Sequence, residues 1–168
     1  MVNRNRLELR PKEPKELGDP ISLAYINVPL DFLISDIKME DTDGNLVARH
    51  LILASPEQMQ FLKGAATWYL DGTFKAVRQP FVQLFGVHAF LRCSDSIKQV
   101  PLVNVLMSRR TKVDYTAVFR ELVQSLGEEM NLEECVLDFE LVAWISLREV
   151  FPEMHIHGCQ FHYSQAIF

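Results

Sequence analysis

Residues 135–157 read CVLDFELVAWISLREVFPEMHIH, and they contain a strand, a helix and a second strand in close succession. The run Cys135–Asp138 is short and apolar, which is typical of a buried strand. Pro152 ends the helix that follows, because proline cannot continue a helical ladder. The apolar stripe of that helix consists of Leu141, Trp144, Ile145 and Phe151. The second strand fits Met154–His157. Because a strand–helix–strand crossover favours parallel pairing with the helix on a sheet face, this stretch predicts an α/β sheet.

Three further strands and another helix are predicted before this stretch. The apolar runs Trp68–Phe74, Phe81–Leu91 and Val100–Met107 fit strands. An amphipathic helix follows them, closed by Gly127. Its apolar face consists of Tyr115, Val118, Phe119, Leu122 and Leu126. The order of three strands, helix, strand, helix and strand matches a ribonuclease H-like α/β fold, a mixed sheet flanked by helices.

The residues before this core carry turn and helix-start patterns. The turn cluster Asp41–Asn45 precedes an apolar run at Leu46–Ala54, which predicts a hairpin. Ser55 is suited to cap a short helix that starts at Pro56 and runs to about Ala66. We therefore divide the chain into a flexible lead-in, a hairpin with a short helix, and the core, at residues 1–20, 21–66 and 67–168.

Composition excludes several classes of protein. The chain has 168 residues, of which 48% are hydrophobic and 23% charged, so it can bury one sizeable core and is not of disordered composition. No secretory signal and no apolar run of the roughly 20 residues of a membrane helix is visible. Three widely spaced cysteines do not suggest a disulfide framework. The net charge of −5 argues against tight autonomous DNA binding, although a metal-dependent nucleic-acid enzyme also needs clustered carboxylates.

Two aspartates occupy positions that suggest a metal site. Asp71 lies in the first core strand and Asp138 at the C-terminal tip of the fourth, where ligands bind in open α/β sheets. Two neighbouring carboxylates repel one another unless a cation lies between them, and Mg²⁺ and Mn²⁺ prefer such oxygen ligands. The alternative is structural, because an aspartate near a helix start is often a cap and one before glycine often belongs to a turn.

Four motifs together resemble Mutator-like element (MULE) transposases. They are WYLDGTFK at 68–75, QLFGVH at 83–88 with VPLV at 100–103, DFE at 138–140, and GCQFHYSQ at 158–165. They occur in the order found in that family, and the similarity runs from about Pro20 to the last residue. Each motif alone is weak, but the set is specific.

The resemblance implies the core of a DDE-type transposase with a ribonuclease H-like fold, which cuts and transfers DNA strands with Mg²⁺ or Mn²⁺. Asp71 and Asp138 would be its first two metal-binding carboxylates. The family's third is a glutamate well beyond the Cys-x-x-His motif, and no glutamate follows His162 in this sequence. We therefore expect a fold incomplete at its C-terminal end and little activity from this chain alone. Transposon-end DNA as the partner and a nuclear location follow from the resemblance only.

Cys159 and His162 could in principle be zinc ligands, since Cys-x-x-His spacing can place both on one ion. His155 and His157 alternate with Cys159 and could complete a set of four. A buried cysteine and surface histidines are the commoner explanation, so zinc is not the favoured reading. No glycine-rich phosphate loop is present, and no nucleotide site is expected.

A rival hypothesis is a non-enzymatic protein that retains the fold as a binding or interaction module. In that case the acidic residues only cap or solvate the fold. The sequence from Ser164 reads as the start of a helix, and we expect an apolar face at Ala166–Phe168 that a partner or a second copy could cover. Cation-dependent stability would separate the two hypotheses.

Overall fold

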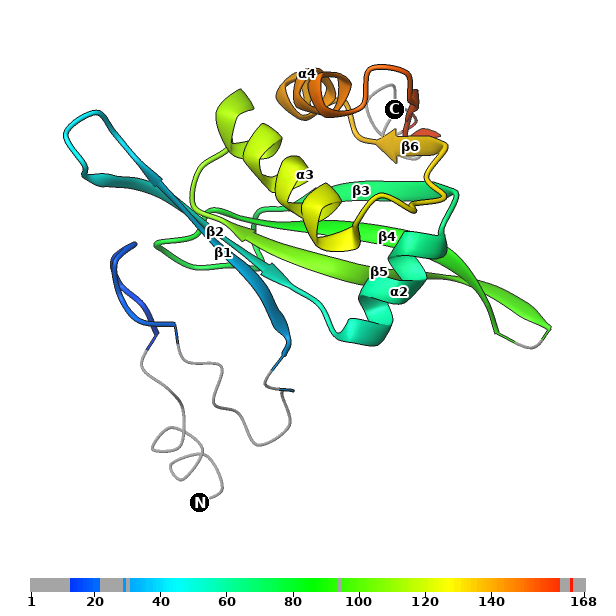
Figure 1. Cartoon of the computed structure of the whole chain (residues 1–168), viewed down its shortest axis with the longest axis horizontal. Helices are drawn as coiled ribbons and strands as arrows, with labels where there is room; N and C mark the ends of the chain where they lie inside the picture. The colour runs from blue at the N-terminus through cyan, green and yellow to red at the C-terminus, as the bar shows by residue number, and fades with distance from the viewer. Residues whose placement is uncertain (1–12, 22–28, 30, 94, 161–163, 165–168) are drawn as a thin grey trace.

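The computed structural model describes residues 13–21, 29, 31–93, 95–160 and 164. Within them a seven-stranded sheet is accompanied by three helices (Figure 1). The elements in chain order are β1 (Leu33–Glu40), β2 (Leu46–Leu53), α2 (Pro56–Gly64), β3 (Thr67–Thr73), β4 (Gln83–Cys93), β5 (Ser96–Met107), α3 (Lys112–Leu126), β6 (Glu134–Leu137), α4 (Leu141–Val150) and β7 (His155–Gly158).

The strand order is β1-β2-β5-β4-β3-β6-β7, so β3 lies between the antiparallel and parallel parts of the sheet. Strands β1 to β5 pair antiparallel, whereas β3, β6 and β7 pair parallel to one another. The two crossovers that carry α3 and α4 give this parallel part. The predicted α/β class and ribonuclease H-like mixed sheet are confirmed.

The hairpin β1–β2 belongs to the same sheet as the rest of the fold. β2 pairs with β5, with His50 opposite Met107 and Leu53 opposite Asn104. The helix α2 starts as predicted, with Ser55 accepting from the backbone of Gln58 and the Gln58 side chain accepting from Ser55. It ends at Gly64, two residues before the predicted end.

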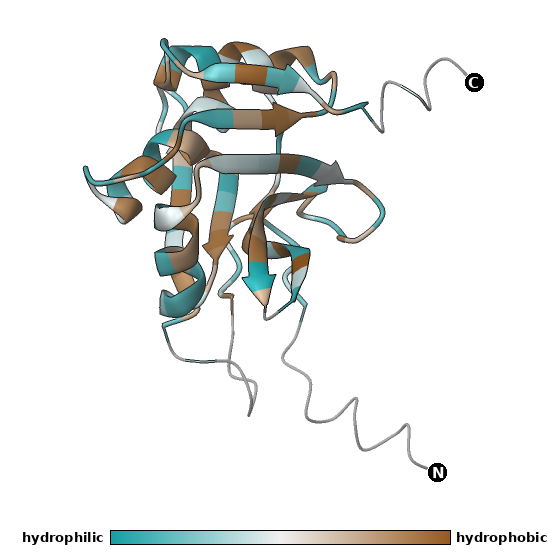
Figure 2. Cartoon of the chain, turned by 90° about the vertical axis from the view of Figure 1, so that its right-hand side faces the viewer, coloured by the Kyte–Doolittle hydropathy of each residue, from teal (hydrophilic) through white to brown (hydrophobic). Residues whose placement is uncertain are grey.

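One face of the sheet is packed against the helices. Alternate residues of β3 and β6 are buried on this face, namely Trp68, Leu70, Cys135 and Leu137. Helix α3 covers them with a stripe that includes Tyr115 and Phe119, and Figure 2 shows α2 and α3 along the same side of the sheet. Trp68 and Phe119 are fully buried core aromatics, whereas Trp144 is partly buried.

The other face is covered in part by residues 13–21. Arg49, which is almost fully buried on β2, donates from Nη1 to the carbonyl oxygens of Leu17 and Asp19 at 2.8 and 2.6 Å. Its Nε and Nη2 donate to Asp36, each at 2.7 Å. The arginine therefore attaches this part of the expected lead-in to β1 and β2, while residues 1–12 lie outside the described residues.

Candidate active site

Asp71 on β3 and Asp138, the residue directly after β6, lie at neighbouring positions near the ends of two parallel strands. Leu70 of β3 is paired with Leu137 of β6, so the next residue of each strand is one of the aspartates. Adjacent strands lie about 4.8 Å apart, and paired residues project to the same face. Because Leu70 is buried against the helices and β3 continues to Thr73, Asp71 belongs to the opposite face of the sheet. This face carries no helix among the described elements and is called the helix-free face below. The two predicted residues are thus brought together, each partly exposed.

Cys159 lies one strand further along the sheet than Asp138. Gly158 of β7 pairs with Leu137, and the Cys159 backbone N–H donates to the Leu137 carbonyl at 2.8 Å. Cys159 therefore follows in register beside Asp138. It is partly exposed. The proposed zinc partner His162 lies outside the described residues.

The two upstream histidines of the zinc hypothesis are exposed on β7. His157 Nε2 lies 3.9 Å from Glu134 Oε1, which is a long ion-pair contact. Among the residues that the structure describes, no three histidine, cysteine or acidic side chains are grouped to hold a metal ion. A zinc site at Cys159 and His162 stays a prediction.

Asp138 also has a structural contact. Its Oδ1 accepts from the backbone N–H of Glu140 at 3.3 Å, at the turn that leads into α4. Its own carbonyl accepts from Trp144 Nε1 at 2.6 Å. This turn contact fixes the side chain and resembles the capping alternative. It engages one carboxylate oxygen, and a carboxylate offers further acceptor positions on both.

His88 lies beside Asp71 and was missed as a site residue. Asp71 is paired with Gly86 of β4, and a Cβ atom at Gly86 would lie 2.5 Å from His88 Nε2, so the imidazole occupies the space that Gly86 leaves free. Burial lowers the pKa of His88, and the charge of Asp71 opposes that shift without overcoming it. The imidazole is therefore neutral near pH 7. The sequence indicated His88 only as the last residue of the QLFGVH motif.

Arg110 brings a positive charge to the same end of the sheet. Its guanidinium lies 4.5 Å from the ring centroid of Phe74, three residues after Asp71. Its Nη1 is 3.7 Å from Glu140 Oε1, and the side chain is 42% exposed. Arg110 therefore lies close to both segments that carry the aspartates.

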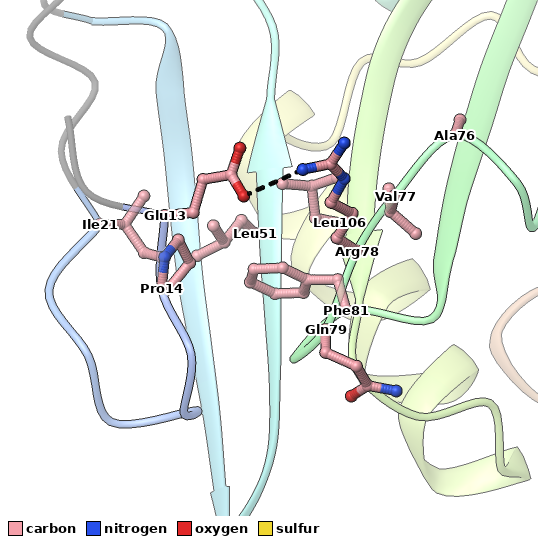
Figure 3. Close-up of a pocket in the computed structure, with 10 residues that line it drawn as sticks. All are labelled: Glu13, Pro14, Ile21, Leu51, Ala76, Val77, Arg78, Gln79, Phe81 and Leu106. Atoms are coloured by element: carbon pink, nitrogen blue, oxygen red, sulfur yellow. Dashed lines mark hydrogen bonds and ion pairs between the residues drawn. The ribbon is translucent and has the colours of Figure 1, made fainter. Parts of the chain in front are cut away.

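A separate cavity of about 410 Å³ lies on the helix-free face, between residues 13–21 and the loop 76–81 (Figure 3). Its wall is largely apolar and includes Leu51, Phe81 and Leu106. Glu13 and Arg78 form an exposed ion pair of 3.4 Å across it. Neither Asp71 nor Asp138 lines the cavity, so it is distinct from the paired carboxylates.

Comparison with known proteins identifies one family. A family model described as the MULE transposase domain matches residues 67–166, more than half of the chain. The match begins with β3 and contains Asp71, Asp138, Cys159 and His162. No curated protein and no solved structure matches the chain. In the described residues, no helix is long and apolar enough to cross a membrane.

Proposed function

The chain belongs to the MULE transposase domain family, and on that premise we propose that Asp71 and Asp138 form the metal-binding part of a transposase core that cuts and joins DNA strands. One observation carries the proposal. The parallel pairing of Leu70 with Leu137 puts the two aspartates at the next position of adjacent strands. Asp71 lies within β3, and Asp138 directly follows the last ladder pair.

The donor set suits Mg²⁺ or Mn²⁺. Both residues offer carboxylate oxygens, which hard divalent cations prefer, and two like charges about one strand spacing apart repel until a cation neutralises them. Bound ions would supply Lewis-acid stabilisation of a phosphoryl group and activation of an attacking water or 3′-hydroxyl. Asp71 and Asp138 would hold them.

The surrounding residues have supporting roles in this proposal. The turn contact from the Glu140 N–H orients Asp138. The neutral imidazole of His88 adjoins Asp71 without competing for it as a cation. Arg110 supplies a partly exposed guanidinium that can contact a DNA phosphate, held by Phe74 and Glu140. A nuclear location and transposon-end DNA as the partner belong to the same proposal.

Cation-dependent stability tests the proposal. Thermal unfolding of the full chain is measured with and without Mn²⁺ for the wild type, Asp71→Asn, Asp138→Asn and the control Asp95→Asn, an exposed aspartate of the β4–β5 hairpin. A ligand that binds only the folded state raises the unfolding midpoint. We expect Mn²⁺ to raise it for the wild type and the control but not for the two site variants. An equal response of all four proteins, or no response of the wild type, would contradict the metal pair.

A non-enzymatic module is the second candidate, favoured by the contact from the Glu140 N–H to Asp138. If Asp138 serves only as this cap, its replacement by asparagine retains an acceptor oxygen and costs little stability. Mn²⁺ would then leave every midpoint unchanged.

A further inference from the structure

A buried hydrogen-bonded group lies behind the two aspartates on the helix side of the sheet. The Tyr115 hydroxyl of α3 lies 2.9 Å from Gln83 Oε1 and 2.8 Å from Glu140 Oε2. Tyr115 and Gln83 have no exposed surface, and the Glu140 side chain is 20% exposed. One hydroxyl therefore joins β4 to the N-cap of α4.

Both ends of this group reach the segments that carry the aspartates. On one side, the Gln83 amide packs against Gly72, the residue after Asp71, so closely that a Cβ atom at Gly72 would collide with Nε2. On the other side, Glu140 is two residues from Asp138 and donates its backbone N–H to Asp138 Oδ1. The Tyr115 hydroxyl is the link between the two sides.

The number of available hydrogens shows which atoms of this group donate and which accept. Tyr115 has one hydroxyl hydrogen but faces two acceptor oxygens, while Gln83 Nε2 has no partner among the described residues. If the Gln83 amide is flipped so that Oε1 and Nε2 exchange places, Nε2 donates to the Tyr115 hydroxyl and this hydroxyl donates to Glu140 Oε2. Burial, with the nearby Glu140 charge, strongly raises the pKa of Tyr115, so the hydroxyl keeps its hydrogen. The two hydrogen bonds then run in one direction, from β4 to α4.

We propose that Tyr115 is a positioning residue for the metal pair, and that its hydroxyl fixes the spacing of Asp71 and Asp138 through Gln83 with Gly72 on one side and Glu140 on the other. The inference rests on the proposed function, because it concerns the same two carboxylates. A phenylalanine at this position would retain the ring packing on Phe85 and Phe119. The hydroxyl is therefore the part of the side chain that the positioning role requires.

The test measures Mn²⁺ affinity of the full chain by electron paramagnetic resonance of the free ion. The variants are Tyr115→Phe, which removes the hydroxyl alone, and Gln83→Leu, which breaks the link from the β4 side. Phe119→Leu is the control, because it perturbs the same buried helix face one turn later without touching the hydroxyl. Asp71→Asn reports on the metal pair itself.

Residues that support metal ligands typically change affinity by about 10- to 100-fold. We expect about tenfold weaker Mn²⁺ binding for Tyr115→Phe and Gln83→Leu, and wild-type affinity for Phe119→Leu. Wild-type affinity in both Tyr115→Phe and Gln83→Leu would overturn the positioning role and leave the metal pair intact. Equal weakening in Phe119→Leu would also overturn it, since loose packing would then explain the loss. If the wild type binds Mn²⁺ no better than Asp71→Asn, the proposed function fails and the inference fails with it.

Discussion

Replacement of Asp114 by alanine should cost more stability than any surface change in this protein. Asp114 is fully buried near the start of α3. Its Oδ2 accepts from the Thr111 backbone at 2.7 Å and from the Thr111 hydroxyl at 2.6 Å. Arg109 Nε donates to the same carboxylate at 2.9 Å, and His50 Nε2 lies 3.2 Å from Oδ1. One carboxylate thus caps α3 and pairs with two basic side chains.

The magnitude follows from what the substitution leaves behind. Loss of the helix cap costs about 1 kcal/mol. His50 is fully buried and its Nδ1 has no partner among the described residues, so Asp114→Ala leaves the whole ring without a hydrogen bond. Leaving a buried polar group unpaired costs roughly 1–3 kcal/mol, and breaking a buried pair can cost about 3–5 kcal/mol. We expect a total loss of about 3–5 kcal/mol, because these contributions overlap.

Urea unfolding at neutral pH measures this loss. Asp43→Ala, in the exposed turn between β1 and β2, is the control and should change stability by less than about 0.5 kcal/mol. The double variant His50→Leu with Asp114→Ala should recover part of the loss, since it removes the unpaired imidazole as well. A cost below about 1.5 kcal/mol for Asp114→Ala, or a double variant less stable than the sum of the single ones, would refute this account of the pair.

Three further outcomes can be checked. Burial lowers the pKa of His50 below its ordinary value of 6.5, although the charge of Asp114 opposes this shift, so the unfolded chain binds the proton more readily than the folded one. The free energy of unfolding should therefore decline as the pH falls below 6.5. Urea unfolding measures it, and a flat pH profile would contradict this prediction. Gly72→Ala should lower stability by about 1–3 kcal/mol through its collision with Gln83, whereas Gly64→Ala, with open space around it, provides the control in thermal unfolding. Arg49→Ala should release residues 13–21 and speed their proteolysis, measured by mass spectrometry against Arg92→Ala; equal rates would show that the arginine does not hold them.

Local patterns were enough to predict most helices and strands, whereas the choice of Asp71 and Asp138 as a pair depended on the resemblance to MULE transposases. The capping box of Ser55 and Gln58 lies within four residues, so the sequence shows the start of α2 directly. The crossover through α4 predicts the parallel pairing of β6 with β7. It does not predict the pairing of β3 with β6, which brings Asp71 and Asp138 together across two intervening strands and α3.

The residues that surround the pair could not be predicted in this way. His88 approaches Asp71 because Gly86 has no side chain, and that depends on the register of β3 against β4. Tyr115 meets Gln83 and Glu140 across separations of 32 and 25 residues, through a sheet and two helices. The periodicity of the sequence does not indicate such contacts, because each of these three residues also suits its own helix, strand or cap without them.

The two acidic residues of the DFE motif illustrate why spacing in the sequence is a poor guide to shared chemistry. Asp138 directly follows Leu137, the last residue of β6 in the ladder, and therefore lies next to Asp71. The turn into α4 then reverses the direction of the chain, and Glu140 points to Tyr115 and Arg110 instead. Had Glu140 lain beside Asp71 as well, it would have been the obvious third ligand. Both oxygens of Glu140 are engaged, Oε2 by the Tyr115 hydroxyl and Oε1 by Arg110 Nη1 at 3.7 Å, and this argues for a supporting role.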